Sequence, residues 1–226
     1  PDTVREHILK CKNATNKPFG VNIPLMYPQI EEIMQIVIEE KVPIIFTSAG
    51  NPKTWTSRLK KEGILVAHVV SSSKFALKAT EAGVDAIVAE GFEAGGHNGR
   101  EETTTLTLIP QVRKATDLPL IAAGGISSGE SMAAAFALGA EGVQVGTRFA
   151  LTVESSASDA FKQKCITLNE GDTTISLKKV TPVRLIKNQF YQQVQEMEDQ
   201  GATAEELRTF LGKGRSKRGI FEGDLS

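Results

Sequence analysis

The sequence predicts an α/β fold whose centre is a parallel sheet. Short, continuous apolar runs recur about every 20–30 residues, and an amphipathic helical pattern separates each run from the next. Strands that are apolar on both faces are typical of parallel sheets covered by helices on each side. Several of the runs also end in glycine-rich loops, which is where α/β folds usually bind ligands.

The predicted elements alternate regularly along the first two thirds of the chain. Strands are expected at residues 19–23, 43–47, 64–70, 86–90, 119–122 and 142–147. Helices are expected at residues 1–12, 30–40, 55–62, 73–82, 108–115 and 130–138, and further on at 183–197 and 204–211. Gly83 is placed to close the fourth helix as a C-cap. The regular alternation makes a set of unrelated α and β elements the weaker interpretation.

Composition is that of an ordinary globular protein and excludes several classes of function. Of the 226 residues, 40% are hydrophobic and 23% charged, and the formal net charge is −1. This charge does not attract nucleic acid or a membrane surface, and no apolar run approaches the ~18 residues of a membrane span. Cys11 and Cys165 lie far apart without metal-ligand spacing, so we expect no metal site and two reduced thiols in a cytoplasmic protein.

The clearest candidate for chemistry follows the fourth predicted strand. Residues 89–99, with the sequence Ala-Glu-Gly-Phe-Glu-Ala-Gly-Gly-His-Asn-Gly, come directly after an apolar run. Glycine lets the backbone adopt positive φ and approach a ligand closely, and His97 lies among these glycines just past a strand end. The unperturbed pKa of histidine suits proton transfer near neutral pH. The alternative is a tight turn with a solvated histidine. His68, by contrast, is expected to be packed within a strand.

Two later strand ends form a candidate phosphate site. Residues 122–126 (Ala-Ala-Gly-Gly-Ile) and 145–148 (Val-Gly-Thr-Arg) each place small residues between a strand and a helix. In (β/α)₈ barrels, the loops after strands seven and eight commonly bind phosphate through backbone N–H groups. Under that count the strand at 19–23 is the third, so we expect a TIM-type barrel whose first two βα units precede Pro1. An open doubly wound sheet is the alternative fold, and close helix–strand packing is the alternative use of the glycines.

Other strand ends carry polar or small residues suited to a flavin. Asn22 is an amide that closes an otherwise apolar strand, Ala49 and Gly50 follow the second strand, and Glu90 lies at the tip of the fourth. Amides, a carboxylate and bare backbone together suit a flavin ring and its ribityl hydroxyls. Asn22 or Glu90 taken alone would more often be a helix cap or a surface residue.

Taken in order, these segments resemble a known family of flavoenzymes. Residues 19–22, 48–52, 90–97, 122–125 and 145–149 are similar to motifs of the flavin-dependent enoyl-acyl-carrier-protein reductase II family, which is related to the nitronate monooxygenases (2-nitropropane dioxygenases). The resemblance runs from about residue 19 to the C-terminus. Both branches share the glycine–histidine motif, whereas residues 49–52, 183–189 and 214–224 look more like the reductase branch. The family's Gln-Gly-Gly-Met-like first strand has no counterpart here, and residues 71–73 are serines where a proline is often found.

The resemblance implies a fold, a cofactor and a reaction. It implies an FMN-binding barrel over residues 1–155 and a small helical lid region with a tail over residues 156–226. NADH or NADPH would reduce the FMN, which passes hydride to a trans-2-enoyl thioester of acyl-carrier protein or CoA in fatty acid biosynthesis. His97 is the implied catalytic residue. The implied FMN-binding residues are Asn22, Ala49, Gly50, Glu90, Gly95, Gly96, Ala123, Gly124, Gly125, Gly146 and Thr147.

Two other functions fit the same motifs. A nitronate monooxygenase would oxidise alkyl nitronates with O₂ and use no nicotinamide, with His97 beside the nitronate. A non-catalytic barrel would only bind a phosphate ligand. We expect a homodimer, whichever of these functions the protein has. The basic run at residues 213–218 is expected to be a solvated loop, with contact to phosphates or to an acidic acyl-carrier protein as the alternative.

Overall fold

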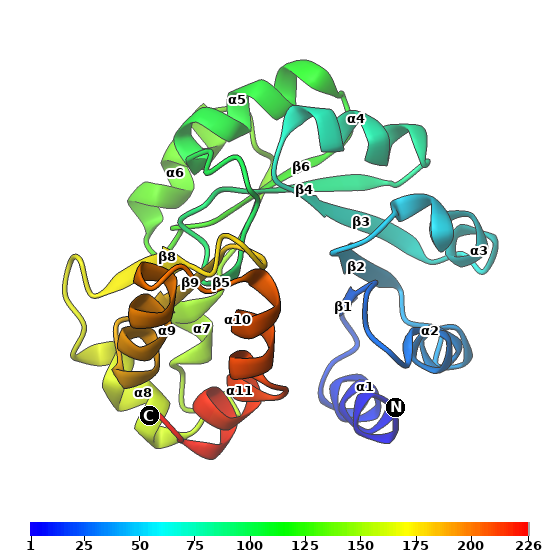
Figure 1. Ribbon diagram of the computed structural model, residues 1–226. Helices are drawn as coiled ribbons and strands as arrows, with labels where there is room; N and C mark the ends of the chain where they lie inside the picture. Colours follow the sequence, from blue (N-terminus) through cyan, green and yellow to red (C-terminus); the bar gives the residue numbers. More distant parts are fainter. Residues whose placement is uncertain (226) are drawn as a thin grey trace. The chain divides into compact units, whose positions relative to one another are not determined.

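The chain folds as two compact units, each of which is described on its own. The computed structural model describes residues 1–225 (Figure 1). The first unit comprises residues 1–90, 106–122 and 135–142, and the second comprises residues 91–105, 123–134 and the chain from 143 onward. The chain therefore passes from one unit to the other several times.

The first unit is built on strands that alternate with helices. Its helices are α1 (Asp2–Ala14), α2 (Ile30–Glu39), α3 (Thr56–Lys61) and α4 (Ser73–Glu81), with a 3₁₀ turn, η1 (Pro52–Thr54). Its strands are β1 (Gly20–Pro24), β2 (Ile44–Ser48), β3 (Leu65–Val70) and β4 (Ala86–Glu90). Four more elements have residues in both units, namely α5 (Thr105–Ala115), β6 (Leu120–Ala123), α6 (Gly129–Ala137) and β7 (Gly142–Gln144).

Six strands form one curled sheet in the order β1-β2-β3-β4-β6-β7. The strands from β1 to β4 pair in parallel, so that Gly20 lies opposite Ile44 and Ile44 lies opposite Leu65. The order never reverses along the chain, whereas a doubly wound sheet has a point of reversal. The predicted α/β class with a parallel sheet is therefore confirmed, and the curled six-stranded sheet is consistent with part of a TIM-type barrel.

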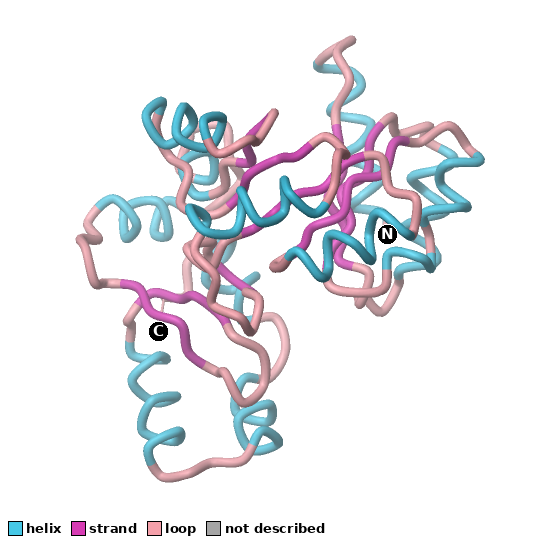
Figure 2. Tube along the Cα trace, turned by 90° about the horizontal axis from the view of Figure 1, so that it is seen from above, coloured by secondary structure: helices cyan, strands magenta, loops and turns pink. Residues whose placement is uncertain are grey.

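Helices pack against the strands of the first unit, and the contact between these layers is apolar. α3 packs on β3, and α4 packs on both β3 and β4. Figure 2 shows helices running alongside the strands. The largest fully buried side chains of this core are Met34, Val37, Val42, Ile45, Leu59, Val66, Ile87, Val88, Leu108, Ile109 and Leu120. Full burial of such a side chain contributes about 1.5–3 kcal/mol, so this contact dominates the stability of the unit.

The single tryptophan of the chain belongs to the first unit. Trp55 precedes α3 as its N-cap residue and is only 4% exposed. The guanidinium carbon of Arg58, one turn further on, lies 5.1 Å from the centroid of the indole ring. The indole is thus buried and in cation–π contact with Arg58, an arrangement that favours a fixed ring position.

The second unit combines short helices with a small antiparallel sheet. Its elements are β5 (Gly96–His97), α7 (Thr147–Ala150), α8 (Asp159–Ile166), β8 (Thr173–Ser176), β9 (Val183–Ile186), α9 (Gln189–Asp199), α10 (Ala204–Leu211), α11 (Arg215–Lys217) and a π-helical turn, η2 (Arg218–Glu222). The sheet has the order β5-β9-β8. Four buried side chains, Leu177, Phe190, Val194 and Leu207, form a separate apolar cluster beside it.

Three predicted boundaries in this part of the chain are wrong. The helix expected at 183–197 is the strand β9 followed by α9, because Asn188 ends the strand region and caps the helix by accepting a hydrogen bond from the N–H of Tyr191. The strand expected at 142–147 ends at Gln144, and Thr147 already begins α7. The helix expected from residue 108 starts at Thr105. The predicted helix at 204–211 is confirmed, and a capping box at Thr203 and Glu206 fixes its start.

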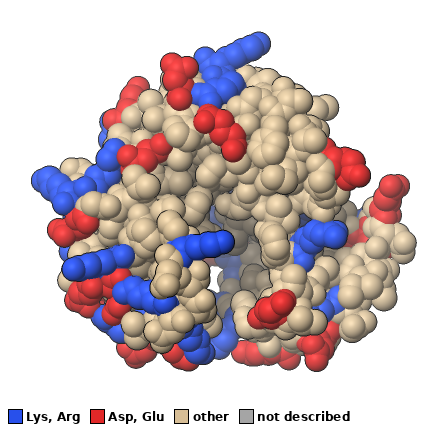
Figure 3. Space-filling model, turned by 180° about the vertical axis from the view of Figure 1, so that it is seen from behind, with Lys and Arg blue, Asp and Glu red and all other residues tan. Residues whose placement is uncertain are grey.

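Charged side chains of both signs are interspersed on the face drawn in Figure 3, in keeping with the net charge of −1. None of the helices between residues 1 and 225 has the length and apolar composition needed to span a lipid bilayer. Cys11 and Cys165 are free thiols, as the sequence predicts.

Candidate active site

The glycine–histidine loop follows β4 and belongs to the second unit. The N–H of Gly91 donates to the carbonyl of Ala123 at 2.9 Å, and the N–H of Phe92 donates to the carbonyl of Thr103 at 3.0 Å. The loop therefore leaves the strand end attached to two other segments of the chain. These two hydrogen bonds fix the path of the first half of the loop, while the alternative of a tight turn with a solvated histidine stays open for His97.

A carboxylate and a hydroxyl join this loop to the turn after β6. The carboxylate of Glu93 accepts hydrogen bonds from the backbone N–H of Thr105 at 3.0 and 3.1 Å and from its hydroxyl at 3.0 Å. The same hydroxyl lies 2.9 Å from the carbonyl of Gly124. Hydrogen bonds to an ionised acceptor are stronger than neutral ones. Glu93 and Thr105 thus couple the histidine loop to one of the two predicted phosphate loops.

The glycines at this junction are required by close packing. A Cβ on Gly91 would lie 2.1 Å from the hydroxyl oxygen of Thr105, and a Cβ on Gly124 would lie 2.6 Å from the carbonyl oxygen of Gly91. Gly124 and Gly125 also have φ values of +98° and +69°, which L side chains rarely adopt. Gly91 and Gly124 therefore allow close approach between the histidine loop and the turn after β6, and whether the glycines serve only close helix–strand packing stays open.

His97 projects from the far end of the loop, where the chain becomes a strand. Gly96 lies opposite Arg184 and His97 lies opposite Val183 in the antiparallel β5–β9 pair. The N–H of Asn98 donates to the carbonyl of Pro182 at 2.9 Å, and its side-chain amide donates to the carbonyls of Ala94 and Gly96 at 2.9 and 3.0 Å. His97 itself is exposed. The backbone of His97 is therefore held in place, and its imidazole is accessible from outside the protein.

Several predicted cofactor residues leave bare backbone in open surroundings. A Cβ added to Gly95, Gly96 or Gly146 would meet no atom within 4 Å. Gly146 is the N-cap residue of the single-turn helix α7. Because glycine has no side chain, it makes no side-chain capping hydrogen bond. Eight of the predicted site residues lie in the second unit, namely Gly95, Gly96, His97, Ala123, Gly124, Gly125, Gly146 and Thr147. Of these, the structure connects the histidine loop with Ala123 and Gly124 through hydrogen bonds.

Four predicted site residues lie in the first unit, on or just after strands. Ala49 and Gly50 follow β2, and Ala49 has φ of +50°, which is uncommon for a residue with a side chain. A Cβ on Gly50 would lie 2.6 Å from the Cβ of Leu25, so the strand ends of β1 and β2 touch there. Asn22 lies in the middle of β1 and does not close the strand.

Glu90 is the last residue of β4, and burial raises its carboxyl pKa above the ordinary range. Desolvation disfavours the charged form of a carboxyl group that has no compensating cation. A carboxyl group with a pKa shifted in this way is a candidate for binding a ligand.

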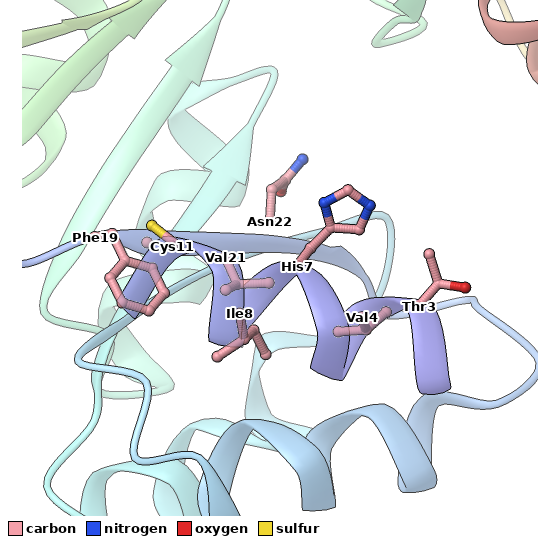
Figure 4. A pocket seen from close by; sticks show the side chains of 9 residues that line it. Thr3, Val4, His7, Ile8, Cys11, Phe19, Val21 and Asn22 are labelled. Carbon is pink, nitrogen blue, oxygen red and sulfur yellow. The ribbon is translucent and has the colours of Figure 1, made fainter. Parts of the chain in front are cut away.

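A groove of about 370 Å³ runs between α1 and β1. Figure 4 shows Val4, Ile8 and Val21 along it, with the side chains of His7 and Asn22 pointing to the same side. The residues that line the groove are Thr3, Val4, His7, Ile8, Cys11, Phe19, Gly20, Val21 and Asn22. The sequence gives no sign that α1 and β1 would enclose such a groove, because the groove depends on how the two elements pack.

His68 is a structural histidine, as predicted. It is 5% exposed on β3, and its Nδ1 lies 2.7 Å from the hydroxyl oxygen of Thr47 on β2. Burial lowers the pKa of His68 to about 4, so the imidazole is neutral at physiological pH. No group of three or more His, Cys, Asp or Glu residues among positions 1–225 is arranged to hold a metal ion.

Comparison with protein families identifies the relatives of this chain. The model of the nitronate monooxygenase family matches residues 27–218. A 5-hydroxy-7a-methyl-1-oxo-octahydro-1H-indene-4-carboxyl-CoA dehydrogenase of Rhodococcus jostii is 39% identical over 171 residues, which cover 76% of this chain and 48% of that protein. A probable nitronate monooxygenase of Staphylococcus saprophyticus is 32% identical over 211 residues, which cover 86% of this chain and 59% of that protein. The chain thus spans about half the length of the curated relatives that it matches.

Solved structures give the same result. FabK from Thermotoga maritima, an enoyl-ACP reductase II, superposes with a TM-score of 0.90 and 43% identity, covering 100% of this chain and 71% of the FabK chain. A nitroalkane oxidase from Streptomyces ansochromogenes superposes with a TM-score of 0.78 and 25% identity, covering 96% of this chain and 76% of the other. The match over residues 27–218 and these similarities show that the chain belongs to the nitronate monooxygenase family.

Proposed function

We propose that the protein is an FMN-dependent oxidoreductase that reduces trans-2-enoyl-acyl-carrier-protein thioesters with NADH or NADPH. The observation that carries the proposal is the histidine loop, in which an exposed His97 lies on backbone fixed by hydrogen bonds on both sides. The 43% identity and TM-score of 0.90 to FabK support the reductase branch over the length of this chain.

The glycine turns of the second unit fit the phosphate end of FMN. Gly124 and Gly125 turn the backbone at positive φ, and Gly146 faces open space where a side chain would otherwise lie. We propose that backbone N–H groups of these residues and of Thr147 bind the phosphate, and that Gly95 and Gly96 leave room for the ring. Contacts of Asn22, Ala49, Gly50, Glu90 and Ala123 with the cofactor stay predictions.

We propose His97 as the proton donor in this reduction. Bound FMN would supply the hydride that adds to the β-carbon of the enoyl thioester. Saturating the double bond also requires a proton at the α-carbon. The imidazole of His97 is exposed to an incoming substrate, and the bonds on both sides of it limit its motion. A positioned general acid of this kind accelerates a reaction about 10²–10⁴-fold.

Nitronate oxidation is the second candidate, and the family match favours it. The family model and the Staphylococcus saprophyticus relative both carry the nitronate monooxygenase name. In that reaction O₂ would be the oxidant, no nicotinamide would be needed, and His97 would act on the nitronate. The Rhodococcus jostii relative is named for a carboxyl-CoA substrate, so a second relative besides FabK is linked to acyl thioesters.

Two assays separate the reactions, one without oxygen and one in air. The protein is supplied with FMN and either NADH or NADPH without oxygen, and the absorbance of the nicotinamide is followed after adding crotonyl thioesters of acyl-carrier protein or CoA. In a parallel assay, oxygen consumption is followed with alkyl nitronates in air. We expect thioester-dependent oxidation of the nicotinamide and slow nitronate turnover. Fast nitronate oxidation without enoyl reduction would assign the monooxygenase, and binding of FMN without either reaction would leave a binding protein.

A further inference from the structure

We infer that Arg184 is a positioning residue that holds the His97 loop in its working conformation. The inference rests on the proposed function, because it concerns the placement of His97 as proton donor. Its structural basis lies entirely within the second unit, where β5, β9 and the loop before β5 are in direct contact.

The guanidinium of Arg184 contacts both the backbone and the ring of the residue at the start of the loop. Its Nε and one terminal nitrogen donate to the carbonyl of Phe92 at 3.1 and 3.0 Å. Its guanidinium carbon lies 5.2 Å from the centroid of the Phe92 ring, within the range of a cation–π contact. The other terminal nitrogen donates to the hydroxyl of Thr173 on β8 at 3.3 Å. One side chain on β9 therefore ties Phe92 to the small antiparallel sheet.

The strand pairing at His97 is short, so further contacts are needed to attach the loop to β9. β5 has two residues, and each of its hydrogen bonds contributes only ~1 kcal/mol net. Beyond His97, Asn98 donates to Pro182, and Arg100 donates to the carbonyls of Lys178 and Val180 at 3.2 and 2.9 Å. Before His97, Arg184 is the side chain of β9 that reaches back to the loop. His97 thus lies between two attachments to the β8–β9 segment, and Arg184 makes the first of them.

The geometry requires an arginine at this position. A planar guanidinium directs two N–H groups at one carbonyl oxygen and stacks on a ring at the same time, whereas a lysine ammonium supplies a single flexible point charge. Arg184→Lys should therefore keep the charge but hold Phe92 less firmly, and Arg184→Met should remove the attachment while filling a similar volume. A displacement of about 1 Å at a reacting group can lower turnover about 10²-fold.

Kinetics of the two half-reactions test the inference in the full-length, FMN-loaded protein. Arg184→Met is expected to slow enoyl reduction about 10- to 100-fold, with Arg184→Lys between it and the parent. FMN content and the rate of flavin reduction by NADH should stay within about twofold of the parent, because neither needs His97 in place. Arg208→Met, which changes an exposed arginine on α10 of the same unit, is the matched control and should leave all rates unchanged. Equal behaviour of Arg184→Met and Arg208→Met would overturn the inference, as would a parallel loss of FMN and of both half-reactions.

Histidine resonances give a readout that does not depend on turnover. The chain has three histidines, and His7 and His68 lie in the first unit, so they serve as internal references. With ring-labelled histidine, Arg184→Met should shift or broaden the signals of His97 while leaving those of His7 and His68 in place. Unchanged His97 signals in Arg184→Met would refute the positioning role, whatever the turnover of the variant. If His97→Asn left enoyl reduction intact, the assignment of His97 as proton donor would fail, and if the parent showed no enoyl reduction, the proposed function would fail. In both cases the resonance comparison would still decide whether Arg184 orders the loop.

Discussion

The core of the first unit and the histidine loop of the second unit are held by different kinds of interaction. In the first, parallel strands and apolar side chains such as Ile45 and Ile87 form a core in which burial is complete. In the second, the histidine loop is held by the carboxylate of Glu93, the hydroxyl of Thr105 and the guanidinium of Arg184. Apolar packing is non-directional and tolerates volume-conserving changes, whereas these polar contacts each require a particular atom at a particular place. The comparison teaches that stability and placement of reactive groups are assigned to different residues.

Replacing His97 tests this comparison most directly, and we expect the largest effect on activity there. His97→Asn keeps a polar side chain of similar size but removes a group that titrates near neutral pH. Enoyl reduction should fall about 10²–10⁴-fold, equivalent to roughly 3–5 kcal/mol of barrier. The measurement is single-turnover enoyl reduction by stopped flow, with flavin reduction followed separately.

The matched control for that substitution lies in the other unit. His7→Asn changes an exposed histidine on α1 and should leave both half-reactions as they are. If His97→Asn slows both half-reactions equally, the residue positions the flavin or the nicotinamide. If the variant loses its FMN, His97 is a structural contact of the cofactor and the proton donor lies elsewhere.

A second prediction contrasts one glycine in each unit. Gly63 and Gly124 both have positive φ, but a Cβ on Gly63 would meet nothing within 4 Å, whereas one on Gly124 would collide with the carbonyl of Gly91. Gly63→Ala should therefore destabilise the protein by ~1–2 kcal/mol through backbone strain alone. Gly124→Ala should cost a further ~1–3 kcal/mol through the collision. Urea unfolding measures both, and equal losses in the two variants would contradict the close packing described here.

Sequence patterns predicted the first unit far better than the contacts of the second. Apolar runs locate β1 to β4 within one or two residues, because a buried strand consists mainly of apolar residues. β9 was expected to be helical, since its pairing with β5 joins residues about 90 positions apart and leaves no local signal. The motif containing His97 could be found from glycine spacing and resemblance, whereas its supports could not.

Thr105 shows why such supports escape a linear analysis. Its importance arises from contacts with Glu93, 12 residues before it, and with Gly124, 19 residues after it. A threonine at the start of a helix is usually a cap, so nothing local distinguishes this one. The useful signal is indirect: an acidic residue inside a glycine loop needs a donor, and a cluster of threonines follows at 103–105.

A third prediction concerns acid stability of the first unit. Burial lowers the pKa of His68 from 6.5 to about 4, so protonation favours the unfolded chain. The stabilisation is complete above pH 6.5 and is lost as the pH falls from 6.5 through 4, by about 3 kcal/mol in total. His68→Leu should remove this part of the pH dependence. Urea midpoints of parent and variant between pH 4 and pH 8 measure it, with the exposed His7→Leu as control. An unchanged pH profile in His68→Leu would show that other groups cause the acid sensitivity.

The smallest expected effect is at Glu90. Burial raises its pKa in the folded protein, so ionisation above the unfolded value of 4.5 opposes folding. Glu90→Gln removes that opposition, and its free energy of unfolding should therefore rise relative to the parent between pH 5 and pH 8. Glu62→Gln, at an exposed position after α3, is the control and should follow the parent. A loss of relative stability in Glu90→Gln at pH 8 would indicate that the ionised carboxylate has a partner in solution.

Because Trp55 is buried, its fluorescence can report unfolding without an added label. Because the only tryptophan lies in the first unit, its fluorescence follows the unfolding of that unit, while far-ultraviolet circular dichroism follows the helices of both. Coincident transitions would mean that the two units melt as one cooperative body. Transitions that separate would give the free energy of each unit without any label or truncation, and would show whether the second unit opens first.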